Sequence, residues 1–187
     1  MKSSIPNLLT SLRLAVSLVP LAFLAAAPST AANAALAVLV VAMVTDFLDG
    51  YLARTWNVTS RLGQVLDSIA DKLVLTSLLI LALFHGMLGV MGTAIALLLL
   101  LREVWIGGLR EGLGQQSSLL AASKTAKWKT ALQFTGLAVV FADVAFRFGL
   151  GAVSEFALAP ALVLSLVSAW HYSRQGLLAL AQKEGMQ

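Results

Sequence analysis

The chain has 187 residues, of which 59% are hydrophobic and only 12% are charged. Soluble domains carry about 25% charged residues, so this composition is unsuited to a water-soluble globule, and its hydrophobicity excludes disorder. Cysteine is absent and there are two histidines, which excludes disulfides, thiolate chemistry and a His-based zinc site. The remaining class is a membrane protein that crosses the bilayer several times.

Six segments are long and apolar enough to cross a membrane, which takes about 20 helical residues. In chain order they run over 8–27, 34–55, 63–85, 89–112, 125–147 and 155–178. Breaks rich in glycine, proline or polar residues are expected at Pro28–Thr30, Trp56–Ser60, Gly86–Gly89, Gly114–Ser118 and Gly149–Ser154. The sequence therefore predicts an all-α fold, a six-transmembrane-helix bundle, that forms a single membrane domain over residues 1–187.

Lysine and arginine indicate how the chain is oriented. If the N-terminus is cytoplasmic, Arg147 is the one basic residue, among 13, that falls at an outer end. Cytoplasmic loops are enriched in Lys and Arg, so we expect both termini on the cytoplasmic side. The net charge of +4 then reflects orientation, and we expect no nucleic-acid partner. Segment 8–27 loosely resembles a cleavable signal peptide, but Arg13 within it favours a retained span.

Four aspartates lie inside the second and third segments. Asp46 and Asp49 are about 60° apart on one helix face, and Asp67 and Asp71 about 40° apart on the next. An ionised side chain at mid-membrane costs roughly 2.5–3.5 kcal/mol, so such a cluster needs compensation. The short connector makes the two helices antiparallel neighbours, whose carboxylates can meet in the cytoplasmic half. Hard oxygen ligands in this number predict two Mg²⁺ or Mn²⁺ ions.

Small and basic residues surround the acidic cluster. Gly50 and Gly63 each lie about one helical turn from an aspartate, where a missing side chain opens space for a ligand. Arg54 follows one turn after Gly50, where a guanidinium can meet a phosphate. Ser60 lies in the connector at the membrane surface.

Residues 46–71 have the sequence DFLDGYLARTWNVTSRLGQVLDSIAD. Their fixed positions form the pattern D-x2-D-G-x2-A-R-x8-G-x3-D-x3-D. This pattern resembles the signature of the CDP-alcohol phosphatidyltransferase family. The resemblance implies an integral membrane enzyme with six transmembrane helices, usually a homodimer. Such enzymes move a phosphatidyl group from a CDP-linked lipid to an alcohol and release CMP.

The resemblance also implies roles for individual positions. The residues that would hold metal are Asp46, Asp49 and Asp67. The fourth aspartate, Asp71, would act as the catalytic base and also approach the second metal ion. The positions that would contact the CDP-linked lipid are Gly50, Arg54 and Ser60.

Basic residues beyond the motif indicate which alcohol is the acceptor. Arg102 and Arg110 are about two turns apart and share a helix face. Lys127 and Lys129 lie further along and diverge by about 200° on a regular helix. Clustered cations predict an acceptor that itself carries phosphate, with the two arginines as first candidates and Lys127 next. Alternatively such cations meet anionic lipid headgroups, which we favour for Lys124.

Three further stretches are similar to one branch of the family, the bacterial phosphatidylglycerophosphate synthases. They are IPNLLTSLR from residue 5, LREVWIGGLR from residue 101 and AKWKTALQ from residue 126. The resemblance implies transfer from CDP-diacylglycerol to glycerol 3-phosphate in the bacterial inner membrane, with the active site on the cytoplasmic side. Ala126 departs from the branch, which commonly has glycine there. Asn7, Thr10 and Arg13 match its N-terminal pattern, without an assigned role.

Two alternatives remain open. One is a sibling transferase whose acceptor is inositol phosphate, serine or phosphatidylglycerol. The other is an ion-coupled transporter that uses the intramembrane carboxylates. Transporters of that kind typically have repeats and helices broken by glycine or proline. The four prolines of this chain all lie outside the acidic segments 34–55 and 63–85, which favours the enzyme.

Overall fold

The computed structural model describes residues 4–56, 61–114 and 124–184, and these residues form helices without any strand. In chain order the helices are α1 (Ser4–Val16), α2 (Val19–Ala22), α3 (Pro28–Trp56), α4 (Arg61–Phe84), α5 (Val90–Leu113), α6 (Lys124–Phe146), α7 (Ala152–Phe156) and α8 (Ala159–Glu184). They divide into two compact units. The first comprises Met1–Leu88 and Leu137–Gly151, and the second comprises Gly89–Gly136 and Ala152–Gln187.

Four stretches within the described part of the chain are long and apolar enough to cross a membrane. They are Pro28–Leu52, Val90–Leu113, Trp128–Phe146 and Ala152–Ala179. The prediction of an all-α, multi-pass membrane protein is therefore confirmed, whereas a bundle of six spans is not. Helix α4 has 24 residues, enough to cross a bilayer, but it carries Asp67, Asp71 and Lys72 in its first half. Any stretch of α4 long enough to span a membrane contains all three of these charges, which separates it from the other four.

The first predicted span departs from the structure in a way that proline explains. Instead of one helix over 8–27, α1 ends at Val16 and α2 begins at Val19. Pro20 stands in the first turn of α2, where its missing N–H costs nothing because first-turn donors have no helical acceptor. The same preference places Pro28 at the start of α3, so the break expected at Pro28–Thr30 lies inside a helix.

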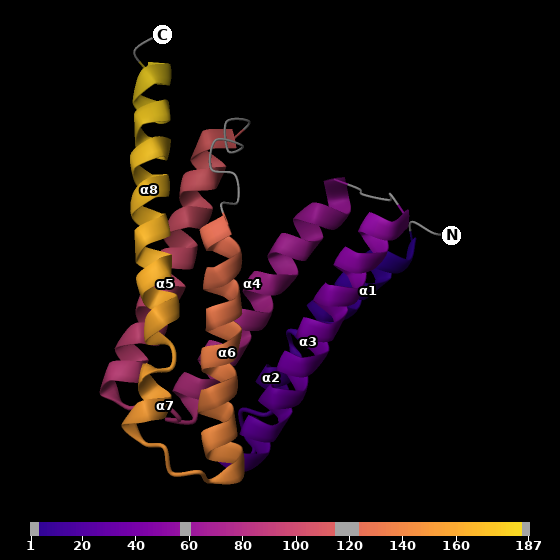
Figure 1. Cartoon of the computed structure of the whole chain (residues 1–187), viewed down its shortest axis with the longest axis vertical. Coiled ribbons are helices and arrows are strands. Elements are labelled where there is room, and N and C mark those ends of the chain that lie inside the picture. Colours follow the sequence, from indigo (N-terminus) through magenta and orange to yellow (C-terminus); the bar gives the residue numbers. More distant parts are fainter. Residues whose placement is uncertain (1–3, 57–60, 115–123, 185–187) are drawn as a thin grey trace. The chain divides into compact units, whose positions relative to one another are not determined.

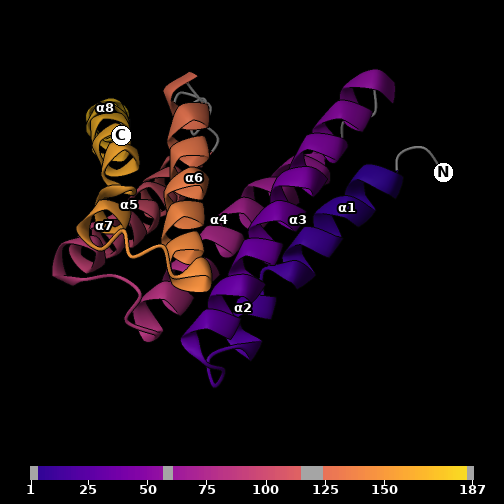
Figure 2. The same cartoon turned by 60° about the horizontal axis from the view of Figure 1, so that its bottom comes forward.

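The first unit is built around the close packing of α1 with α3 and α4, which lie side by side in Figures 1 and 2. Ala31, Ala32 and Ala35 of α3 are fully buried, and such small side chains let helix backbones approach closely. Larger side chains, Leu78 and Leu81 of α4, fill the remaining core. This packing places the polar segments of the three helices together.

The second unit pairs α5 with α8 (Figure 1). Its core contains Ile106, Leu109 and Leu113 of α5 packed with Tyr172 of α8. The first turn of α5 meets a carboxylate from α7, because Glu155 Oε2 accepts a hydrogen bond of 3.4 Å from the backbone N–H of Gly92. A negative group at this end satisfies an otherwise unpaired N–H and suits the helix dipole.

Gly136 of α6 lies close to the turn between α7 and α8, so we expect alanine there to be destabilising. An added Cβ would lie 2.7 Å from the carbonyl oxygen of Ala157, a backbone atom that cannot turn aside. The Gly136→Ala variant should lose about 1–3 kcal/mol of stability, the usual range for overpacking. Thermal unfolding in detergent measures this. Gly108→Ala is the matched control, because no atom lies within 4 Å of its added Cβ, and an unchanged or higher melting temperature is expected.

Candidate active site

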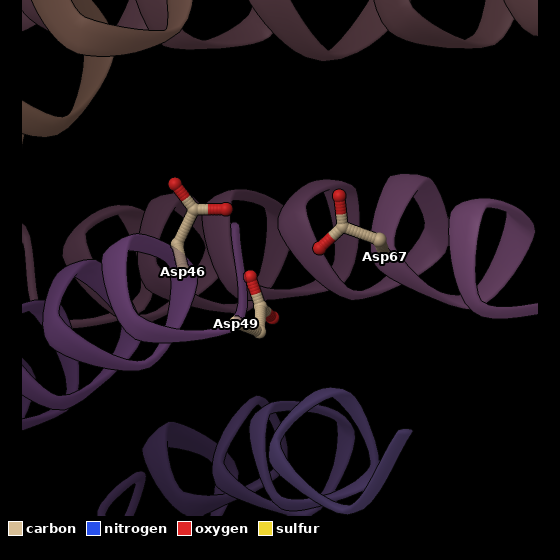
Figure 3. Close-up of side chains that lie close together, drawn as sticks. All are labelled: Asp46, Asp49 and Asp67. Carbon is tan, nitrogen blue, oxygen red and sulfur yellow. The ribbon is translucent and has the colours of Figure 1, made fainter. Parts of the chain in front are cut away.

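Three carboxylates from two helices meet at one place in the first unit. Asp46 and Asp49 project from α3 and Asp67 projects from α4 (Figure 3). One oxygen of each lies within 4.8 Å of the others, close enough to bind one metal ion together. The convergence expected from their spacing is thus present. It arises because residues three apart share a helix face, and because α3 and α4 are neighbours.

A buried arginine from α1 holds these carboxylates together. Arg13 Nη2 lies 2.5 Å from Asp49 Oδ2, and Arg13 Nη1 lies 2.6 Å from Asp67 Oδ1. The same Nη1 is 2.9 Å from Asp71 Oδ1 and 3.3 Å from Asp46 Oδ1. One guanidinium therefore pairs with all four aspartates of the motif, which explains how so much negative charge is tolerated among packed helices.

Exposure differs sharply across this cluster. The side chain of Arg13 is 1% exposed, whereas those of Asp46, Asp67 and Asp71 are 57%, 42% and 33% exposed. Asp49, at 10%, is the most enclosed of the carboxylates. The arginine thus lies on the protein side of the cluster, and three carboxylates present an open side from which an ion or a substrate can approach.

The donor set suits a hard divalent cation. Carboxylate oxygens are the ligands that Mg²⁺ and Mn²⁺ prefer, and these ions commonly share their coordination with substrate phosphates. Asp46, Asp49 and Asp67 supply such oxygens at close range, while Asp71 lies outside that group of three and one helical turn further along α4. The residues present therefore fit a divalent metal site.

The positions expected to contact the CDP-linked lipid are only partly visible. Gly50 directly follows Asp49 on α3 and is half-buried. Arg54 belongs to the last turn of α3, but its side chain lies outside the described residues, as does the whole of Ser60. The structure thus places Gly50 next to the carboxylates.

The cations expected to bind the acceptor phosphate belong to the second unit, where Arg102 and Lys129 each form an ion pair with Glu103. Arg102 donates from Nη1 to Glu103 Oε1 at 3.0 Å, from Nε to the carbonyl oxygen of Ser165 at 3.2 Å and from Nη2 to Ser168 Oγ at 2.7 Å. Lys129 pairs with the same oxygen of Glu103. Arg102 therefore ties α5 to α8.

Arg110 is half-buried in the last turn of α5. The side chain of Lys127 lies outside the described residues. Because α6 is a regular helix from Lys124 onward, the backbone positions 127 and 129 are rotated by about 200° around its axis.

Arg13 is the residue of this cluster to which the sequence pattern gave no role. The sequence does indicate that Arg13 has a partner, because burying the charge of an arginine within an apolar stretch is costly unless a counter-charge is nearby. The sequence does not say which partner. The carboxylates that satisfy Arg13 lie 36, 54 and 58 residues away for Asp49, Asp67 and Asp71.

Comparison with known proteins agrees with this geometry. The family model for CDP-alcohol phosphatidyltransferase matches residues 3–170, which is most of the chain and includes every aspartate of the cluster. The chain belongs to the CDP-alcohol phosphatidyltransferase family. The resemblance carried by residues 46–71 is thereby confirmed, and so is membership in a family of transferases.

Several curated members of this family carry the same name, CDP-diacylglycerol–glycerol-3-phosphate 3-phosphatidyltransferase. The one from Cereibacter sphaeroides is 46% identical over 143 residues, which cover 75% of this chain and 64% of the relative. The one from Haemophilus influenzae is 40% identical over 99 residues, covering 52% of this chain and 53% of the relative. The one from Rickettsia bellii is 36% identical over 138 residues, covering 73% and 74%. The match thus spans less than two thirds of the first two relatives.

Proposed function

We propose that this chain transfers the phosphatidyl group of CDP-diacylglycerol to glycerol 3-phosphate, giving phosphatidylglycerophosphate and CMP. The observation that carries the proposal is the gathering of all four motif aspartates around one point in the first unit. Family membership supports the transfer chemistry, and the shared name of its relatives supports the choice of acceptor.

The chain's residues have distinct tasks in this reaction. The acceptor hydroxyl oxygen forms a new bond to the phosphorus of the phosphatidyl group, and the bond from that phosphorus to the CMP oxygen breaks. Asp71 takes the hydroxyl proton, as a carboxylate beside the metal ligands can. Asp46, Asp49 and Asp67 bind the divalent ions. When bound, two Mg²⁺ or Mn²⁺ ions neutralise the pyrophosphate and the charge that develops on CMP.

Substrate binding completes the assignment. We assign Gly50, Arg54 and Ser60 to the CDP-linked lipid, because Gly50 leaves space beside Asp49 and a guanidinium suits a diphosphate. We assign the acceptor phosphate to Arg102, Arg110, Lys127 and Lys129. Glu103 already pairs with Arg102 and Lys129, so phosphate must compete with this carboxylate for them. Arg110, which shares a helix face with Arg102, is the first cation to test, and Lys127 is the next.

The membrane location, the orientation and the oligomeric state are part of the same proposal. The four apolar stretches place the chain in a membrane, which we propose is the bacterial inner membrane, with both termini and the active site on the cytoplasmic side. The Lys and Arg distribution supports that orientation, which reporter fusions at each terminus would test. The family resemblance supports a homodimer, and cross-linking in native membranes would test it.

An acceptor panel tests the reaction directly. Purified protein with Mg²⁺ and CDP-diacylglycerol should release CMP with glycerol 3-phosphate, and not with glycerol, serine or inositol phosphate. A lipid product that contains the acceptor's phosphate confirms the bond that forms. CMP release with serine or inositol phosphate alone would instead assign a sibling transferase. No CMP release with any acceptor, together with ion flux in vesicles, would favour the transporter.

Arg110→Ala is expected to weaken binding of the acceptor rather than of the lipid. A charge-assisted contact contributes roughly 1.5–3 kcal/mol, so the KM for glycerol 3-phosphate should rise about ten- to a hundred-fold. Steady-state kinetics with each substrate varied in turn measures the effect. Arg174→Ala is the control, because Arg174 is an exposed arginine on α8 of the same unit. A defect confined to CDP-diacylglycerol would assign Arg110 to the other substrate.

A further inference from the structure

We propose that Arg13 is a positioning residue for the metal site, which gathers the four motif carboxylates from the buried side so that divalent ions bind from the exposed side. This inference rests on the proposed function, since it concerns the same carboxylates. It assigns to α1 a part of the active site that the Asp motif of α3 and α4 does not contain. Arg13 does not touch substrate in this role and acts through the aspartates.

The contacts show why a single arginine can do this. The guanidinium is planar and has donors in fixed directions, so one group can bind several carboxylates at once. Nη1 serves Asp46, Asp67 and Asp71, and Nη2 serves Asp49. Each named contact uses one oxygen of a carboxylate, and a carboxylate has two. Outer partners of this kind orient metal ligands in many proteins.

The formal charge of the cluster is compatible with Arg13 staying in place when metal is bound. Four carboxylates and one guanidinium leave a formal charge of −3, which still attracts divalent cations. Without Arg13 the four negative groups would repel one another and spread apart, so the ligands would lose the spacing that an ion needs. A positive charge beside the site weakens its attraction for a metal ion, and this loss is offset because Arg13 keeps the ligands in place.

Burial argues against a guanidinium that leaves when metal arrives. Arg13 is wholly buried, and its Nε lies 3.5 Å from the hydroxyl of Thr45, which precedes Asp46 on α3. Withdrawal would strip a charged group of its partners inside packed helices, which is costly. The ions instead have access through the exposed sides of Asp46 and Asp67.

Metal binding without substrate tests the proposal. Mn²⁺ is titrated into detergent-purified protein, and the free ion is measured by electron paramagnetic resonance. Arg13→Gln, which keeps a polar side chain but removes the charge, should bind Mn²⁺ about 10- to 100-fold more weakly than the unmutated protein. Arg13→Lys should show an intermediate loss, because a single ammonium keeps the charge but cannot reach four carboxylates in the same geometry.

Lys72→Gln provides the matched control. Lys72 directly follows Asp71 on α4, and within the described residues it makes no ion pair with any carboxylate of the cluster. Its removal takes away one positive charge near the site and should leave Mn²⁺ affinity within about two-fold, the scale of a weak exposed charge. Equal losses in Lys72→Gln and Arg13→Gln would show that the loss does not depend on contact with the four carboxylates and would overturn the positioning role.

The outcomes separate this inference from the function on which it rests. If the unmutated protein binds no Mn²⁺, or Asp67→Asn binds it equally well, the metal site itself is wrong. If that site is present and Arg13→Gln binds Mn²⁺ as tightly or more tightly, Arg13 competes with metal and the positioning role is wrong. Should Arg13→Gln fail to fold, as judged by circular dichroism, Arg13→Lys decides. An unchanged or higher affinity in that variant contradicts the proposal.

Discussion

Asp67→Asn is expected to abolish turnover while the protein still folds and inserts. The substitution preserves the shape of the side chain but removes the charge of one of three carboxylates whose oxygens lie within 4.8 Å of one another. Metal ions contribute several kcal/mol to stabilising charge in such transition states, and about 4 kcal/mol corresponds to a thousand-fold in rate. Release of CMP from CDP-diacylglycerol at saturating glycerol 3-phosphate should therefore fall at least a thousand-fold. The same is expected for Asp46→Asn and Asp49→Asn.

Asp143→Asn is the matched control for this loss. Asp143 lies on α6, and its Oδ1 accepts a hydrogen bond of 2.9 Å from the backbone N–H of Leu150, which an asparagine oxygen can also accept. Activity within about two-fold of the unmutated protein is expected, as for substitutions away from a site. A folded Asp67→Asn protein with nearly normal turnover would contradict the metal site.

Asp71→Asn should reduce the rate much more than the affinity for CDP-diacylglycerol. Asp71 lies outside the group of three close carboxylates, so under the proposed assignment Asp46, Asp49 and Asp67 should still bind metal and the lipid diphosphate. Loss of a positioned base typically costs a hundred- to ten-thousand-fold in rate. Steady-state kinetics should therefore show a kcat lowered by this factor and a KM for CDP-diacylglycerol that changes little.

The converse pattern would assign Asp71 a different task. A normal kcat with a raised KM for the lipid nucleotide would make it a metal ligand only. Mn²⁺ titration of the same variant gives a second test, since a base that is not required for metal should leave Mn²⁺ affinity almost unchanged. Asp71 also pairs with Arg13 at 2.9 Å, so a large loss of Mn²⁺ affinity would indicate that this ion pair orders the cluster.

The acidic half of the site follows from the sequence, because it depends on local geometry. Asp46 and Asp49 are three residues apart, and Asp67 and Asp71 are four apart, so each pair shares a face of its own helix. A connector of a few residues then makes the two helices neighbours. The same local rules predict most helix ends, such as the end of α5 at Leu113 before Gly114, whose φ of 52° suits glycine.

Local rules fail where a polar residue interrupts an apolar stretch, because the sequence does not show which residue is its partner. Segment 8–27 contains Arg13 and Pro20, and its composition alone favours one continuous span. In the structure the helix breaks before Pro20, and Arg13 turns toward carboxylates on α3 and α4. Hydrophobic periodicity shows that the arginine must find a counter-charge, but it contains no information on which helix supplies it.

The partners of the cations in the second unit are likewise not visible in the sequence. The sequence shows that Arg102 and Arg110 share a face of α5, which is correct for any regular helix. Only the packing of α5 against α8 reveals that Arg102 is bound by Ser165 and Ser168, which lie 63 and 66 residues further along the chain. These partners of Arg102 are set by tertiary packing, and the spacing of residues on α5 does not reveal them.

The sequence by itself determined the membrane class and the positions of the four aspartates on their helices, because each depends on composition or on spacing within one or two neighbouring helices. The family was indicated by the resemblance of residues 46–71 to a known motif. The tertiary structure decided that Arg13 joins the acidic cluster, that Glu103 holds Arg102 and Lys129, and that a side chain fits at Gly108 but not at Gly136. The physical reason is the short range of sequence periodicity, which orders residues on one helix, whereas side-chain partners depend on which helix lies across from them.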